Sequence, residues 1–342
     1  MNYYIVILSL FYSLCSQAQG VWVTRYALKE KRTISSLLTF VQKNRITDVF
    51  IQVRGRGDAY YSSEVEQNDV HSSSEENLVY LIGELKRLNI KSHAWLNTFL
   101  IASHTDQVED ETNHILNRFP HWLDYTVSLK RMTRTDAVEG LYISPANRGV
   151  LYYYKQLVNE LITQYAFDGI HLDYFRKASA MHGFHPKFRD AFYAKTGKRA
   201  EEITRGIYQT YHAYTQFLAD QYTQFLADLT ASSNHVIWSV AVKPDIELAK
   251  NEYSQDWLRW IKEDLVNFVI PMNYTPEHQV FNQRIETYTR SEKDKIWVGI
   301  ATYNQPLNEI KKRIAYTKKH RFNVTIFSFN DLKDKAIMDI LN

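Results

Sequence analysis

The stretch GIHLDYF, residues 169–175, decides the fold of this chain. It is a short apolar run that favours a strand, and polar groups appear along it and at its end. Successive side chains of a strand point to opposite faces, so Ile170 and Leu172 share one face while His171 and Asp173 share the other. Burying an unpaired charge is costly. Asp173 therefore indicates either an ion pair that closes the strand or a functional site.

Seven further stretches of this kind alternate with helical patterns along the chain. The predicted strands are GVWVTRY (20–26), DVFIQVRG (48–55), KSHAWLN (91–97), GIHLDYF (169–175), VIWSVAVK (236–243), LVNFVIPMNY (265–274), KIWVGIAT (295–302) and NVTIFSF (323–329). Helices are expected near 33–44, 75–88, 253–262, 277–290 and 306–319, followed by a closing helix. A further helix is expected to begin near Pro145, with Ser144 as its cap, and long helical stretches are expected between the fourth strand and about residue 232.

This alternation predicts a parallel sheet. Eight strand–helix units in roughly 320 residues predict an α/β fold, a (β/α)8 TIM barrel, as a single domain over residues 19–342. An open doubly wound sheet is disfavoured because no glycine-rich phosphate loop follows the first strand.

Composition excludes some classes of function. The 342 residues carry a net charge of only +3, so no nucleic-acid partner is expected. Aromatic residues make up 14% of the chain. Such a content suits either an aromatic core or a cleft in which rings stack on sugars.

The segment MNYYIVILSLFYSLCSQAQG, residues 1–20, resembles a signal peptide because its apolar run is too short to span a membrane. Ser16 and Ala18 fit the small-x-small cleavage rule, so we expect a signal peptide over residues 1–18 and an exported protein. Lipid attachment at Cys15 is the less favoured alternative, because Leu14 stands where a small residue is needed.

About 50 residues, 98–148, separate the third strand from its helix. A connection this long usually carries function or has structure of its own. We expect it to form a wall of the cleft, with Trp122 in contact with the ligand.

In a barrel, the C-terminal ends of the strands carry the chemistry. Alternation places Arg54 of the second strand on the inner face, together with His93, Trp95 and Asn97 of the third strand. In the fourth strand it places Tyr174 on the outer face and Phe175 on the inner face. Four carboxylates follow strand ends: Asp58, Asp173, Asp245 and Glu277. The expected substrate-binding residues are Arg54, His93, Trp95, Asn97, His171, Tyr174, Arg176, Asn273, Tyr274 and Glu277. For His93 and Asn97, an interior hydrogen-bonded layer is an equal alternative; for Trp22, Trp95, Trp238 and Trp297, core packing is favoured.

Six stretches resemble, in order, the motifs of the glycosyl hydrolase-like 10 family: GVWVTRY, FIQVRGRGDAYYSS, HAWLN, DGIHLDYFR, YSQDWLRWI and VIPMNYT. The resemblance spans about residues 20–330. It implies a bacterial, exported (β/α)8 protein that hydrolyses glycan chains, with cell-wall glycan strands among its suspected substrates. The family motif usually continues as Asp-Tyr-x-Arg-Tyr-Pro, whereas this chain reads DYFRKAS and lacks the Tyr-Pro.

Hydrolysis of a glycosidic bond needs two carboxyl groups that flank it. We expect Asp173 to be the nucleophile or base, kept ionised by Arg176 and His171. Asp245 or Asp58 is expected to be the acid, with Glu277 third. No cofactor or metal is expected, and the partner is a glycan bound by a monomer.

Two alternatives remain open at this stage. A non-catalytic glycan-binding barrel would keep the aromatic cleft without an acid–base pair. A metal-dependent hydrolase is disfavoured because the first strand lacks the His-x-His pair of such barrels.

Overall fold

Eight parallel strands form a barrel in the computed structural model, which describes residues 17–68, 75–108, 112–136, 138–332 and 340–341. The strands are β1 (Gln19–Val23), β2 (Asp48–Arg54), β5 (Lys91–Asn97), β8 (Gly169–Asp173), β9 (Ile237–Val242), β10 (Phe268–Pro271), β11 (Trp297–Ala301) and β12 (Asn323–Phe327). They pair in the order β10-β9-β8-β5-β2-β1-β12-β11. Single parallel bridges, Val269 to Ile296 and Met272 to Gly299, join β10 to β11 and close the circle. The predicted (β/α)8 barrel is confirmed.

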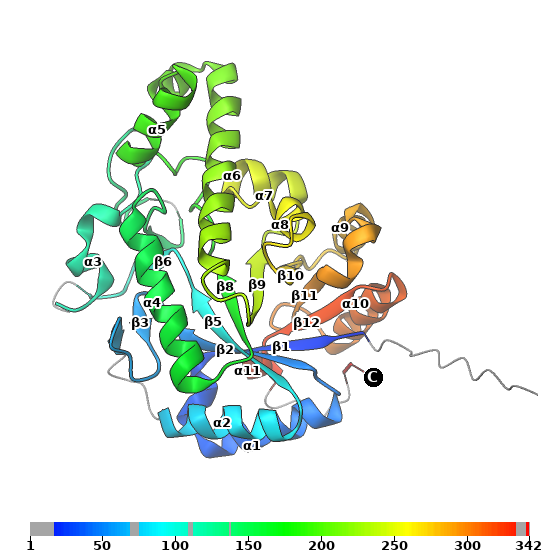
Figure 1. The fold of residues 1–342 in the computed structure, drawn as a ribbon. Coiled ribbons are helices and arrows are strands. Elements are labelled where there is room, and N and C mark those ends of the chain that lie inside the picture. Colours follow the sequence, from blue (N-terminus) through cyan, green and yellow to red (C-terminus); the bar gives the residue numbers. More distant parts are fainter. Residues whose placement is uncertain (1–16, 69–74, 109–111, 137, 333–339, 342) are drawn as a thin grey trace, which may run out of the picture.

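Helices surround the strands, as Figure 1 shows. The main ones are α1 (Lys31–Lys43), α2 (Glu75–Arg87), α4 (Arg148–Tyr165), α5 (Pro186–Thr196), α6 (Tyr208–Thr230), α7 (Ile246–Tyr253), α8 (Trp257–Lys262), α9 (His278–Thr287), α10 (Leu307–Lys319) and the short α11 (Phe329–Leu332). Short 3-10 helices lie at Arg25–Lys29, Pro120–Trp122, Ala200–Arg205 and Arg290–Lys295. No helix among the described residues is both long and apolar enough to cross a membrane.

The segment 98–148 has structure of its own. It forms an antiparallel hairpin of β6 (Leu100–Ser103) and β7 (Gly140–Tyr142), and it carries the short helix α3 (Ile115–Arg118). A smaller excursion after β2 forms β3 (Asp58–Ala59) and β4 (Gln67–Asn68). Both excursions follow the C-terminal end of a barrel strand, where active sites of this fold form.

Two expected helix assignments were wrong. Helix α4 begins at Arg148 after Asn147, not near Pro145, because the backbone N–H of Ser144 still bonds to the Trp122 carbonyl at 2.7 Å. The helix expected at 253–262 is two helices, since Ser254 takes a left-handed φ of 60° and ends α7. Gln255 then turns back to the barrel and accepts from the Lys243 N–H at 2.9 Å, which fixes the end of β9.

Aromatic side chains fill the inside of the barrel. Trp22, Phe50, Trp95, Phe268 and Trp297 form a cluster with Ala241 and Ile270, separate from the larger core between strands and helices. Trp238 belongs to that larger core. Core packing is therefore confirmed for all four strand tryptophans, although two of them also contact the cavity described below. The predicted signal peptide falls on residues 1–16, which lie outside the described residues, and on the two residues before β1.

Candidate active site

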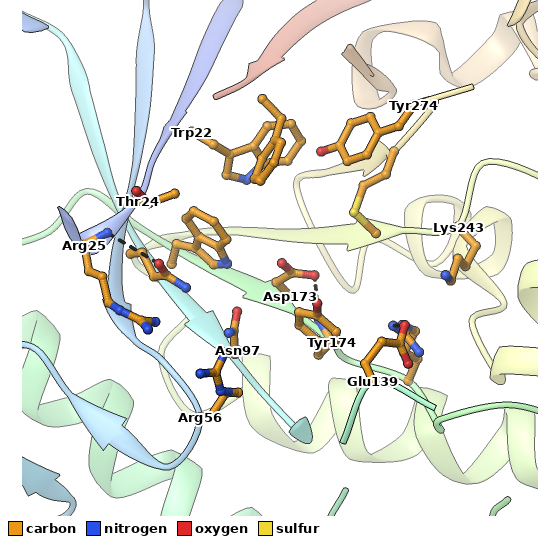
Figure 2. Close-up of a pocket in the computed structure, with 15 residues that line it drawn as sticks. Trp22, Thr24, Arg25, Arg56, Asn97, Glu139, Asp173, Tyr174, Lys243 and Tyr274 are labelled. Atoms are coloured by element: carbon orange, nitrogen blue, oxygen red, sulfur yellow. Dashed lines mark hydrogen bonds and ion pairs between the residues drawn. The ribbon is translucent and has the colours of Figure 1, made fainter. Parts of the chain in front are cut away.

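A cavity of about 400 Å³ opens at the C-terminal ends of the strands, with Asp173 near its centre (Figure 2). Trp22 and Tyr274 lie on one side of Asp173, and Glu139 lies on the other. The lining residues come from most of the strand ends and from segment 98–148: Trp22, Thr24, Arg25, Gln52, Arg56, Trp95, Asn97, Glu139, Asp173, Tyr174, Arg176, Lys243, Met272, Tyr274 and Phe327.

Asp173 is the last residue of β8, and only 8% of its surface is exposed. Burial raises the pKa of this carboxyl to about 6. The opposing contributions are smaller: the Tyr174 N–H donates to Asp173 Oδ1 at 2.7 Å, and the charge of Arg176 favours the ionised form. Asp173 therefore exchanges its proton close to neutral pH, as a group that transfers protons in catalysis must.

Tyr174 breaks the alternation of the strand. Its φ of 51° lies in the left-handed region, which a residue with a side chain rarely adopts. Its ring lines the cavity, while Phe175 packs outside the barrel at 5.0 Å from Phe99 and 5.6 Å from Trp260. The expectation that Tyr174 faces outward and Phe175 inward was wrong, because the strand already ends at Asp173.

Glu139 supplies a second carboxyl to the cavity, and sequence reasoning missed it. It lies in segment 98–148, just before β7, and accepts from Arg176 Nη2 at 2.8 Å. Tyr142 Oη donates to its other oxygen at 3.3 Å. Burial alone would raise the pKa of Glu139, but the charge of Arg176, the hydrogen bonds to the carboxyl and the charge of Lys243 together outweigh burial and lower the pKa below the usual value. Strand alternation cannot identify a carboxylate that lies in a long connection.

Four cations also line the cavity. Arg176 is 3% exposed and is held by Glu139, while Arg56 pairs with Asp106 at 2.6 Å. Burial lowers the pKa of Lys243, whose Nζ lies 4.6 Å from the centre of the Tyr253 ring. Arg25, the fourth, follows β1.

Three buried polar atoms of cavity-lining residues have no hydrogen-bond partner within the described parts of the chain. They are Thr24 Oγ1, Trp95 Nε1 and Asn97 Oδ1, and Trp95 and Asn97 are 4% and 6% exposed. The Trp95 indole N–H helps to lower the pKa of Asp173, although no hydrogen bond of normal length joins them. Buried polar groups are normally satisfied. The Trp95 indole N–H and the side-chain oxygens of Asn97 and Thr24 suit a hydroxyl-rich ligand beside Asp173.

Of the four carboxylates expected at the rim, only Asp173 lines the cavity. Asp58 Oδ1 accepts from the Arg56 N–H at 2.5 Å, and its Oδ2 accepts from Tyr60 Oη at 2.7 Å, so it shapes its own loop. Asp245 is exposed and caps helix α7 by accepting from the Leu248 N–H at 2.9 Å. Glu277 is exposed at the start of α9. The structure therefore does not gather these three around Asp173.

Arg54 also lies outside the cavity. The pairing of β2 with β5 shifts between Gln52 and Arg54, which leaves Gln52 in the cavity. The Arg54 guanidinium is fully buried, forms a 2.5 Å ion pair with Glu66 and donates to the Asn97 carbonyl. It supports the end of β5 instead of facing the ligand.

Three more expected binding residues belong to the interior. His93 bonds to Asp48 at 2.8 Å beneath the site. His171 Nε2 accepts from the Trp22 indole N–H at 3.0 Å, and burial lowers its pKa well below the usual value. Neutral His171 cannot keep Asp173 ionised by its charge, as was expected of it. Asn273 donates to the Phe281 carbonyl at 3.1 Å and does not line the cavity.

Trp122 is a core residue, so its expected role in the cleft wall was wrong. It is 5% exposed, stacks on Phe119 at 4.0 Å and contacts Tyr153 at 5.9 Å. We expect Trp122→Ala to lower the free energy of unfolding by about 3 kcal/mol through the cavity it leaves. Chemical denaturation measures this, with the milder Trp122→Phe as control. Weakened glycan binding at unchanged stability would contradict the core assignment.

The comparisons with known proteins agree with this architecture. The family model described as glycosyl hydrolase-like 10 matches residues 16–316. The chain belongs to this family. It is 21% identical over 319 residues to the glycosyl hydrolase DigH of Escherichia coli K12, a match that covers 82% of this chain and 67% of DigH. The glycosyl hydrolase YngK of Bacillus subtilis 168 is 24% identical over 155 residues, covering 42% of this chain and 28% of YngK.

Solved structures show the same fold in glycoside hydrolases. The glycoside hydrolase domain of PgaB (BpsB) from Bordetella bronchiseptica superimposes with a TM-score of 0.73 at 11% identity, covering 94% of this chain and 97% of that domain. The catalytic domain of a β-amylase from Paenibacillus polymyxa superimposes with a TM-score of 0.62 at 14% identity, covering 92% of this chain and 93% of that domain. Membership in the family and this shared fold point to a glycan-hydrolysing function. Within the described part of the chain, no group of three His, Cys, Asp or Glu residues is placed to hold a metal ion.

Proposed function

We propose that this protein is a glycoside hydrolase in which Asp173 is the general acid and Glu139 the second carboxyl group. The proposal is carried by one observation: the two carboxyls line the same cavity while their surroundings shift their pKa values in opposite directions. Two carboxyl groups whose pKa values are shifted apart in this way can act as a proton donor and an ionised partner. Glycosidases need both, one to protonate the leaving oxygen and one to attack or to activate water.

This assignment reverses the role expected for Asp173. Burial keeps its proton available to pH about 6, which suits the acid better than the nucleophile. Glu139 stays ionised beside Arg176, as a nucleophile or base must. The free Trp95 and Asn97 groups are then placed to bind hydroxyls of the sugar next to Asp173.

The family and the chemistry of the cavity support a substrate class. Aromatic rings on one side and charged groups on the other suit a sugar, which has an apolar face and polar edges. We propose a glycan chain, with bacterial cell-wall strands as the first candidate. Cleavage of the leader after Ala18 would leave Gln19, the first residue of β1, at the start of an exported enzyme.

Two limbs are expected in the pH profile of kcat. Rate should fall above pH about 6 as Asp173 loses its proton, and it should fall again in acid as Glu139 gains one. Glu139→Gln should lower kcat at least ~10²-fold, the usual contribution of a positioned acid or base. The measurement is the release of new reducing ends from purified cell-wall glycan strands and from a panel of neutral oligosaccharides.

Glu277→Gln is the matched control, because Glu277 is exposed at a strand-end loop and does not line the cavity. It should leave the profile unchanged. If the glycans bind and no new reducing end appears at any pH, the protein is a glycan-binding barrel and the proposal is wrong.

A further inference from the structure

Three rings form an aromatic wall on one side of the cavity: Trp22, Tyr274 and Phe327. Tyr274 and Phe327 stack with centroids 5.4 Å apart, and Trp22 lies 6.4 Å from the first and 5.8 Å from the second. The aromatic wall does not stop at the cavity. Tyr303, just after β11 at the same rim of the barrel, lies 6.4 Å from Tyr274 and 6.2 Å from Phe327. The rings therefore lead from the interior to the surface.

Tyr303 is 57% exposed. Single exposed apolar side chains are common and need no explanation by themselves. Tyr303 differs by its position, because among the large exposed apolar residues described, only it and Tyr26 contact cavity-lining residues through their rings. Cations of Arg25 and Lys29 lie over the Tyr26 ring at 4.9 and 5.3 Å. No cation is found over Tyr303 in the part of the chain that is described, so its ring is available to a ligand.

Space for a ligand also continues on the side opposite the aromatic wall. A second, more open cavity of about 530 Å³ shares Glu139 with the first. Its other lining residues are His104, Val138, Ala178, Ser179 and Tyr253. A ligand at Asp173 thus has room on both sides, towards Tyr303 and past Glu139. Such an arrangement fits a chain that passes through the site better than one that ends in it.

We propose that the glycan crosses the mouth of the barrel, and that Tyr303 is the stacking platform for a sugar unit outside the catalytic cavity. This inference rests on the proposed glycoside hydrolase function. A pyranose has a face of C–H groups that packs on an aromatic ring, and an aromatic side chain offers a large contact area at little conformational cost. The site accordingly cleaves within a chain, and affinity grows with chain length until the Tyr303 position is filled.

Binding of a length series tests the proposal. The probes are β-1,4-linked N-acetylglucosamine oligomers of two to six units, titrated calorimetrically into protein that carries Asp173→Asn so that they are not cleaved. The six-unit oligomer should bind more tightly than the two-unit oligomer. Tyr303→Ala should weaken the six-unit oligomer at least ~5-fold, the loss typical of a contributing interface aromatic, and leave the two-unit oligomer unchanged. Tyr303→Phe should keep the wild-type affinities.

Tyr152→Ala is the matched control, because Tyr152 is 65% exposed on α4 and lines none of the described cavities. Affinity independent of length, equal losses for both oligomers in Tyr303→Ala, or no binding of any oligomer would overturn the subsite. Hydrolysis of the same oligomers by the unsubstituted enzyme is measured separately. A length-dependent Tyr303 effect without hydrolysis would refute the proposed function and leave the subsite standing.

Discussion

Asp173→Asn is expected to reduce glycan hydrolysis at least ~10³-fold while glycan binding stays nearly unchanged. The amide keeps the size of the side chain but cannot deliver a proton to the leaving oxygen. Loss of an essential catalytic group costs far more rate than loss of a binding contact. The comparison of kcat and KM for the substituted and unsubstituted enzymes measures the effect.

The same substitution should stabilise the protein at neutral pH. The unfolded chain ionises Asp173 near pH 3.8, whereas the folded protein holds the proton until about pH 6. The folded state binds more protons between these values, so the free energy of unfolding falls as pH rises through them. Asparagine removes this penalty. The free energy of unfolding of Asp173→Asn should exceed that of the unsubstituted protein by up to about 3 kcal/mol above pH 6, and the difference should vanish below pH 4.

Asp124→Asn is the matched control. Asp124 is also buried, its pKa is raised to about 7, and it accepts from the Gly183 N–H at 2.9 Å, but it does not line the cavity. It should share the pH-dependent change in stability without the loss of kcat. If Asp173→Asn unfolds the protein and the folded remainder stays active, Asp173 is a structural residue. If it changes neither rate nor stability, the catalytic assignment moves elsewhere.

Arg54→Met is expected to destabilise the protein by about 3–5 kcal/mol, because it leaves Glu66 charged and unpaired in the interior. Both side chains are fully buried, and Tyr153 Oη donates to the same carboxylate at 2.8 Å. The Asn97 carbonyl would also lose the Arg54 donor, whereas the Thr98 carbonyl would keep the hydrogen bond from Tyr154 Oη. Denaturant unfolding monitored by circular dichroism measures the loss.

The double variant Arg54→Met, Glu66→Leu should recover much of that stability, because it removes both charges together. The exposed pair Arg87 and Glu84 offers the control, and Arg87→Met should cost less than about 1 kcal/mol. If Arg54→Met keeps its stability and loses glycan affinity, Arg54 is the substrate-binding residue that the sequence suggested.

The barrel and one carboxylate of the candidate site, Asp173, could be predicted because they depend on local pattern. Strand–helix alternation fixes a parallel sheet, and side-chain alternation in GIHLDYF fixes the inward direction of Asp173 as long as the strand lasts. The same rule placed Trp95 and Asn97 in the cavity. It failed at Arg54, where the register shifts, and at Tyr174, where the backbone turns left-handed.

The second carboxyl could not be predicted. Glu139 stands in a connection of some 50 residues without periodicity, and only the β6–β7 hairpin and the Arg176 ion pair bring it to Asp173. Asp58 and Asp245 carry the same signal as Asp173, a carboxylate that follows a strand, yet hydrogen bonds within their own loops hold them elsewhere.

The sequence by itself thus determined the barrel, its family and the position of Asp173, because periodicity acts over a few neighbouring residues. Only the tertiary structure decided which carboxylate joins Asp173, that its pKa rises to about 6, and that the aromatic wall reaches Tyr303. Burial, charge and ring contacts of this kind depend on residues far apart along the chain, and their positions exist only after the strands have closed.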